Sequence, residues 1–223
     1  DGLEATTEIL CEWPTPIVII SSAANSDEVG TSMAALKRGA LAVLGKPGMP
    51  DSPEFEREAR RMTSQLYHMS RVKVLRQFAR RQKARHATEK IAVASPLPPK
   101  VSIPKVRCEL VAIGASTGGP PALETLFNGL RADFSIPVLL VQHIAPGFTE
   151  GLVEWLNSVT RFQFVLGADG LAVRAGYIYV APDHHQMTVE RGEICLTRRG
   201  EPSKHCPSVD TLFSSVARAY GER

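Results

Sequence analysis

Ser116 stands among small residues in the segment GASTG at 114–118, and its setting makes it a candidate nucleophile. The segment fits the pattern G-x-S-x-G, which places a serine on a sharp turn between a strand and a helix. The apolar run ELVAI at 109–113 precedes it and PPALETLFNGL at 120–130 follows, as that context requires. Small neighbours would let a carbonyl group approach the hydroxyl, and free N–H groups at the helix start could stabilise an oxyanion.

His143 ends the next predicted strand, PVLLVQH at 137–143, and is the candidate general base. Consecutive parallel strands are usually neighbours, and their carboxyl ends form the crevice where α/β sheets bind ligands. A neutral imidazole there could take the proton of the Ser116 hydroxyl near pH 7. A histidine at a strand end is by itself more often structural, and its position relative to Ser116 favours the catalytic interpretation.

The acid that would orient this imidazole is not evident. Asp169, Asp183 and Asp210 lie at loop positions, and none of them ends a clear parallel strand. Asp210 falls in the first turn of a predicted helix, where an acid is favourable through the helix dipole alone. The triad is therefore incomplete among these residues.

Two other interpretations of the 114–118 turn remain open. It could serve close packing only, or it could hold a phosphate at the helix N-terminus. A dinucleotide fold would place an acid at the end of the next strand to bind a ribose. Gln142 and His143 stand there instead, which disfavours a nucleotide.

The elements that must position these residues fall into three regions: 1–50, 51–107 and 108–223. The first alternates a strand at 16–22, a helix from Ser26 and a strand at 41–47, which predicts a βαβ unit with a parallel sheet. The second begins with a helix and continues as a basic, proline-rich linker. The third alternates strands and helices again, with short β-like runs at 162–167, 176–181 and 187–197 and a final helix at 208–221.

Composition limits the partners and the compartment. The net charge of +3 is too small to imply nucleic-acid binding by the whole chain, and the basic stretch at 71–90 is better explained as a solvated helix and linker. No apolar run is long enough to insert in a membrane, and there is no signal sequence. The four cysteines form no CxxC pair, which favours reduced thiols and a cytoplasmic location. No metal site is expected, because the following residues match no zinc spacing: His184, His185, Cys195, His205 and Cys206.

Several segments resemble, in order and spacing, the catalytic domain of chemotaxis protein-glutamate methylesterases, the CheB family. The segments are IGASTGGPPAL, VQHIAPGFTEGLVEWLN, ADG, GYIYVAPDHH and KHCPSVDTLFSSVA, and the resemblance covers 109–221. It implies hydrolysis of glutamate γ-methyl esters on methyl-accepting chemotaxis receptors, with release of methanol, and deamidation of receptor glutamines. It implies Ser116 as nucleophile, His143 as general base, and Thr117 and Gly118 at the oxyanion hole. It also places His205 near the cleft, where it could contact substrate.

Residues 1–50 resemble the second half of a response-regulator receiver domain. Ser21 matches the hydroxyl residue that reports phosphorylation, and Lys46 matches the lysine that contacts the phosphoryl group. In the complete protein a chemotaxis histidine kinase would be the phosphodonor, and Mg²⁺ is expected only with a complete receiver, so no cofactor is expected for this chain. The phosphoacceptor aspartate and the triad aspartate of the family fall outside 1–223.

The expected fold class is therefore α/β. A partial, flavodoxin-like receiver would be joined by a helical linker to a doubly wound, mostly parallel methylesterase domain lacking its C-terminal part. Residues 1–50 would be unstable in isolation, because two strands leave an open sheet edge. A catalytically inactive partner-binding module of the same fold is the alternative function.

Overall fold

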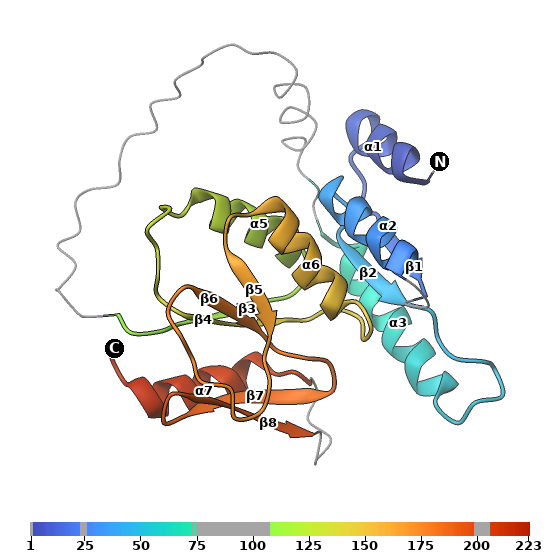
Figure 1. Cartoon of the computed structure of the whole chain (residues 1–223). Helices are drawn as coiled ribbons and strands as arrows, with labels where there is room; N and C mark the ends of the chain where they lie inside the picture. The colour runs from blue at the N-terminus through green and yellow to red at the C-terminus, as the bar shows by residue number, and fades with distance from the viewer. Residues whose placement is uncertain (1, 23–25, 73, 75–107, 199–205) are drawn as a thin grey trace, which may run out of the picture.

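The computed structural model describes residues 2–22, 26–72, 74, 108–198 and 206–223. Two α/β units stand out in Figure 1, one near each end of the chain. Most of the predicted basic and proline-rich linker, and His205, lie outside the described residues.

The N-terminal unit contains the predicted βαβ arrangement. Its elements are α1 (Gly2–Glu12), β1 (Val18–Ser21), α2 (Ser26–Lys37), β2 (Ala42–Gly45) and α3 (Phe55–Met69). Strands β1 and β2 pair in parallel, from Val18 opposite Ala42 to Ser21 opposite Gly45. The crossover through α2 is what a parallel pair requires, since a tight turn joins only antiparallel strands.

The larger unit is built on a parallel sheet with strand order β3-β4-β6-β5. Its elements are β3 (Val111–Ala115), α5 (Gly119–Gly129), β4 (Val138–Gln142), α6 (Thr149–Val159), β5 (Gln163–Leu166), β6 (Tyr177–Val180), β7 (His185–Glu190), β8 (Glu193–Arg198) and α7 (Val209–Tyr220). No helix among the described residues is both long and apolar enough to span a membrane.

Helices cover both faces of this sheet. Side chains alternate along a strand, so Val138 and Leu140 of β4 face the apolar cluster that includes α5 and α6. Leu139 and Val141 face the opposite cluster, to which Leu212 of α7 belongs. This three-layer arrangement confirms the predicted α/β class with parallel sheets.

The run at 187–197 is not one strand but most of an antiparallel hairpin, β7–β8. The hairpin turns at Arg191 and Gly192, whose φ angles are +51° and +82°. Positive φ at both central residues gives the backbone twist that suits two-residue hairpins. The hairpin packs with α7 beneath the sheet (Figure 1).

The two units share one apolar core through a contact of α2 with α6. Met33 and Leu36 of α2 are buried in the same cluster as Phe127 and Leu152 of the larger unit. The helices approach so closely at Gly151 that a β-carbon on that residue would lie 2.0 Å from Val29 Cγ1. No local sequence pattern predicts this contact between the units.

Candidate active site

Ser116 lies on the turn between β3 and α5, in the strand–turn–helix context that its motif predicts. The turn is closed by the Gly119 N–H, which donates to the Ser116 carbonyl at 2.8 Å. Gly118 has φ of +74°, a left-handed conformation that costs a residue with a β-carbon free energy. The Ser116 and Thr117 side chains are exposed on this turn, so the hydroxyl can be reached from solvent.

The first turn of α5 is poorly suited to phosphate. An anion at a helix N-terminus is held by the free N–H groups of the first turn. Pro120 and Pro121 occupy that turn and have no N–H to donate. The first turn therefore lacks N–H groups that would bind a phosphate, which argues against the phosphate interpretation.

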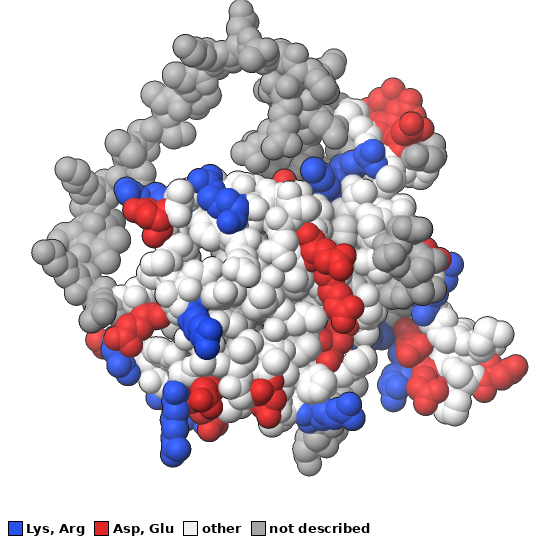
Figure 2. All heavy atoms as spheres, in the orientation of Figure 1, with Lys and Arg blue, Asp and Glu red and all other residues white. Residues whose placement is uncertain are grey.

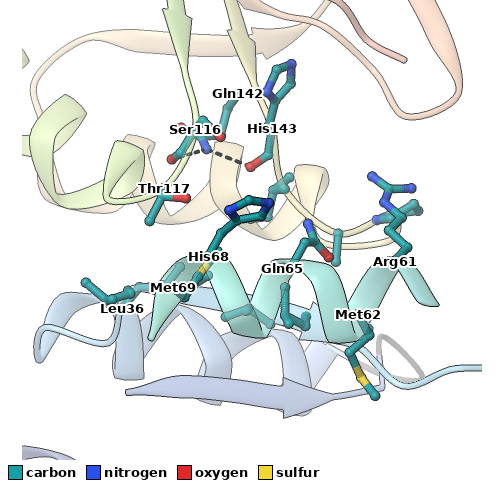
Figure 3. A pocket seen from close by; sticks show the side chains of 18 of the residues that line it. Leu36, Arg61, Met62, Gln65, His68, Met69, Ser116, Thr117, Gln142 and His143 are labelled. Carbon is teal, nitrogen blue, oxygen red and sulfur yellow. Dashed lines mark hydrogen bonds between the residues drawn. The ribbon is translucent and has the colours of Figure 1, made fainter. Parts of the chain in front are cut away.

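His143 follows β4, the direct neighbour of β3. Ala115 lies opposite Gln142 in the parallel register, and the His143 N–H donates to the Ala115 carbonyl at 2.8 Å. The topology thus brings Ser116 and His143 to one sheet edge. The imidazole of His143 points away from Thr117 and from the side chains of α3 (Figure 3). It makes no hydrogen bond with Ser116 in this conformation, so the assigned catalytic roles stay predictions.

Gln142 joins the two loops, and the sequence analysis did not recognise it as a functional residue. Its Nε2 donates to the Ser116 carbonyl and to the His143 carbonyl, both at 2.9 Å. Figure 3 shows the side chain between the two residues. A signal was present, because a glutamine ends a strand that is otherwise wholly apolar.

The three candidate acids have partners or positions of their own. Asp183 accepts from the Gly147 N–H at 2.6 Å and from the Thr149 hydroxyl at 2.5 Å, which ties the start of α6 to the loop after β6. Asp169 accepts from the Leu196 N–H at 2.8 Å in the hairpin. Asp210 lies in the first turn of α7. None of the three is hydrogen-bonded to His143.

A pocket of about 480 Å³ lies in front of Ser116 and is lined by both units. Ser116, Thr117 and His143 line it from the larger unit. The lining residues from the N-terminal unit include Leu41, Lys46 and six residues of α3: Glu58, Arg61, Met62, Gln65, His68 and Met69. Figure 3 shows His68 and Gln65 of α3 pointing toward the Ser116 loop. The sequence predicted the helix, but no local pattern indicated that it would form a wall of this pocket.

One contact between the units uses the N–H of Gly118, which was predicted to contribute to the oxyanion hole. The Gly118 N–H donates to the Leu41 carbonyl at 3.3 Å. In this conformation the Gly118 N–H therefore binds the N-terminal unit and is not available to an oxyanion. None of the described backbone hydrogen bonds of the turn uses the Thr117 N–H, so this group is a donor that a substrate could reach.

The two receiver-like residues are brought together. Ser21 ends β1, Lys46 follows β2, and the Lys46 N–H donates to the Ser21 carbonyl at 3.1 Å. The Ser21 hydroxyl donates to the Ser22 carbonyl at 3.2 Å. Both residues therefore lie at the carboxyl edge of the β1–β2 pair, where α/β sheets bind ligands.

Charges of both signs are interspersed on the molecular face that Figure 2 shows, without a continuous basic surface. Arg131 and Asp133 form an exposed pair with two contacts of 2.9 Å, and the guanidinium lowers the pKa of the Asp133 carboxyl.

Within the described ranges, no group of three or more His, Cys, Asp or Glu residues could hold a metal ion.

Comparison with known proteins gives the family. A model of the CheB methylesterase family matches residues 111–223. A protein-glutamate methylesterase/protein-glutamine glutaminase of Nitrosospira multiformis is 42% identical over 222 residues, which are 99% of this chain and 61% of the relative. A homologue of the same name, numbered 4, from Myxococcus xanthus gives the same three percentages.

A solved structure is also similar, that of the Thermotoga maritima CheB methylesterase catalytic domain. It is 32% identical, with a TM-score of 0.46, over 52% of this chain and 63% of the other. The chain spans about 61% of the length of the curated relatives just described. The family match includes the Ser116 turn, the His143 strand end and the final helix, and on that match the chain belongs to the CheB methylesterase family.

Proposed function

We propose that this chain acts on methyl-accepting chemotaxis receptors, hydrolysing glutamate γ-methyl esters to release methanol and deamidating glutamines. The observation that supports this most is the placement of Ser116. Its exposed side chain stands at the carboxyl edge of a parallel sheet, beside the strand that leads to His143, and faces a pocket. The relatives' names supply the reaction class, since they state both methylesterase and glutaminase.

The first half of the reaction would form an acyl-enzyme. The His143 imidazole turns toward Ser116 and takes its hydroxyl proton, while Oγ attacks the γ-carbonyl carbon. The Thr117 N–H stabilises the resulting oxyanion. Collapse of this intermediate breaks the bond to the leaving group, which takes the proton from the imidazolium and departs as methanol or ammonia.

The second half would release the product. Water loses a proton to His143 and attacks the acyl carbonyl, and the ester bond to Ser116 Oγ breaks. The serine regains the proton from the imidazolium, and the product is the glutamic acid side chain, which loses its proton to solvent and leaves as a carboxylate. Ester and amide substrates converge on the same acyl-enzyme, which is why one site serves both reactions.

The proposal extends to residues 1–50 as a partial receiver in a cytoplasmic protein under phosphorelay control. A chemotaxis histidine kinase would phosphorylate the complete receiver, and Ser21 and Lys46 would contact the phosphoryl group. Phosphorylation would move the N-terminal unit away from the cleft and raise activity. Mg²⁺ would be needed only with the complete receiver, and the described part of this chain has no group of three or more His, Cys, Asp or Glu residues that could hold a metal ion.

Methanol release from methylated chemoreceptor, compared between this chain and its Ser116→Ala variant, tests the activity. Release that the variant abolishes supports the esterase. Absence of release from both favours the alternative, a catalytically inactive partner-binding module of the same fold. The alternative draws support from the orientation of His143 in Figure 3 and from the Gly118 contact with Leu41.

A further inference from the structure

Gln142 is a buried amide at a position where the strand pattern calls for an apolar side chain. Its side chain and backbone are only 4% exposed, and the other four residues of β4 are buried and apolar. Burying an amide is unfavourable unless its polar atoms are hydrogen-bonded. The Gln142 Oε1 is buried without a hydrogen-bond partner among the described residues, so the amide has to be explained by what its Nε2 binds.

The Gln142 Nε2 places its two hydrogens on the two loops that carry the candidate nucleophile and base. It donates to the Ser116 carbonyl and to the His143 carbonyl, at 2.9 Å each. The Ser116 carbonyl also accepts from the Gly119 N–H at 2.8 Å, so two donors fix its direction. An apolar side chain of the same size would fill the space but could fix neither carbonyl.

The direction of the Ser116 carbonyl determines the direction of the Thr117 N–H. The two groups belong to one planar trans peptide unit and point in opposite directions. A carbonyl drawn inward to Gln142 therefore turns the Thr117 N–H outward, toward the side of the turn that faces the pocket. We propose that Gln142 is a positioning residue that aims the Thr117 N–H at the oxyanion, an inference that rests on the esterase function proposed above.

Gly119 leaves room for the Gln142 amide, because it has no β-carbon. An added β-carbon on Gly119 would lie 1.9 Å from Gln142 Oε1 and 2.9 Å from Nε2. Glycine is thus required at this position by the close approach of the amide, and its φ is not in the left-handed region. Any side chain at 119 would displace Gln142 from the two carbonyls.

The test is the rate at which a fluorophosphonate labels Ser116 in the full chain. Ser116 Oγ forms a bond to phosphorus, fluoride leaves, His143 accepts the hydroxyl proton, and a phosphoryl oxygen occupies the oxyanion position. In Gln142→Met, which keeps the side-chain size, we expect the maximal labelling rate to fall about 10- to 100-fold, because a misdirected oxyanion donor loses much of its effect. The reagent concentration at half-maximal rate should stay the same, since the loss concerns the transition state.

The melting temperature separates positioning from a merely structural role. Gln142→Met removes a buried amide oxygen that has no hydrogen-bond partner, but it also takes a donor from the Ser116 and His143 carbonyls. These two effects on stability oppose each other, so the melting temperature should change little. A slower label with an intact melting temperature supports positioning. An unchanged labelling rate in Gln142→Met overturns the proposal.

A double-mutant cycle gives an independent test. Gly119→Ala should slow labelling in the wild-type background, because its β-carbon displaces the amide. In the Gln142→Ala background the same β-carbon meets vacated space, so Gly119→Ala should have little further effect. Equal effects of Gly119→Ala in both backgrounds would contradict the proposed route through Gln142.

Failure of the esterase function itself would be recognised separately. Wild-type chain that is not labelled, like the Ser116→Ala control, refutes the proposed function for this chain. Crystal structures of wild type and Gln142→Met then decide the positioning claim. A Ser116–Thr117 peptide that turns over in the variant supports it, and a peptide that keeps its direction overturns it.

Discussion

At the scale of single residues, Asp183 illustrates how a candidate catalytic acid can serve the scaffold. Its carboxylate accepts the Gly147 N–H and the Thr149 hydroxyl, joining the loop after β6 to the start of α6. The N-terminal N–H groups of a helix lack intrahelical partners, and an acid near them is favourable. Here that acid comes from 34 residues further along the chain than Thr149, a distance that no local capping pattern predicts.

Removal of this carboxylate should destabilise the fold. We expect Asp183→Ala to lower the free energy of unfolding by about 1.5–3 kcal/mol, the usual contribution of hydrogen bonds to a charged group. Urea unfolding followed by circular dichroism measures the change. Asp133→Ala, which removes an acid from a fully exposed ion pair, is the control and should leave the midpoint nearly unchanged. Equal midpoints for both variants would show that Asp183 does not hold the start of α6.

At the scale of elements, the packing of α2 on α6 decides how the N-terminal unit meets the larger one. Gly151 of α6 lies against Val29 of α2, and no β-carbon fits between them. Gly30, the next residue of α2, has open space at its β-position. The two glycines therefore offer a matched pair, one at the contact and one beside it.

The pair predicts opposite effects of one substitution. Gly30→Ala should raise the free energy of unfolding by about 0.5–1 kcal/mol, since alanine is favoured over glycine inside a helix. Gly151→Ala should lower it, because the β-carbon forces α2 away from α6, and amide exchange in 28–37 should become faster. Calorimetry and hydrogen exchange report both. A stabilised Gly151→Ala protein would mean that the α2–α6 contact is looser than described.

Sequence patterns predicted the elements better than the contacts between units. Period-two and helical spacings are local, so the α/β alternation and the turn at Ser116 could be read directly. The shared edge of Ser116 and His143 followed from the rule that consecutive parallel strands are neighbours. The position of α3 beside the pocket depends on packing between distant segments. The role of Gln142 depends on which carbonyl groups its amide reaches in the folded structure. Neither is encoded in a local period.

At the scale of the whole molecule, the apolar core does not stop at the boundary between the units. Leu36 is 1% exposed, and it belongs to the same cluster as Trp155 of α6. Much of that cluster comes from the larger unit, so α2 covers apolar surface that the larger unit would otherwise leave open. A common core makes the two units candidates for a single cooperative transition.

A substitution that destabilises one unit should then destabilise the other as well. Leu36→Ala removes a buried side chain from α2 and should cost about 2–5 kcal/mol. Trp155 fluorescence, isolated by Trp13→Phe, should report the shifted transition although the probe lies in the larger unit. Ile20→Ala, at a position 44% exposed on β1, is the control and should shift the transition less. If Leu36→Ala lowers the unfolding midpoint measured by circular dichroism but leaves the midpoint measured by Trp155 fluorescence unchanged, the units unfold independently. The shared core would then contribute little to the stability of the larger unit.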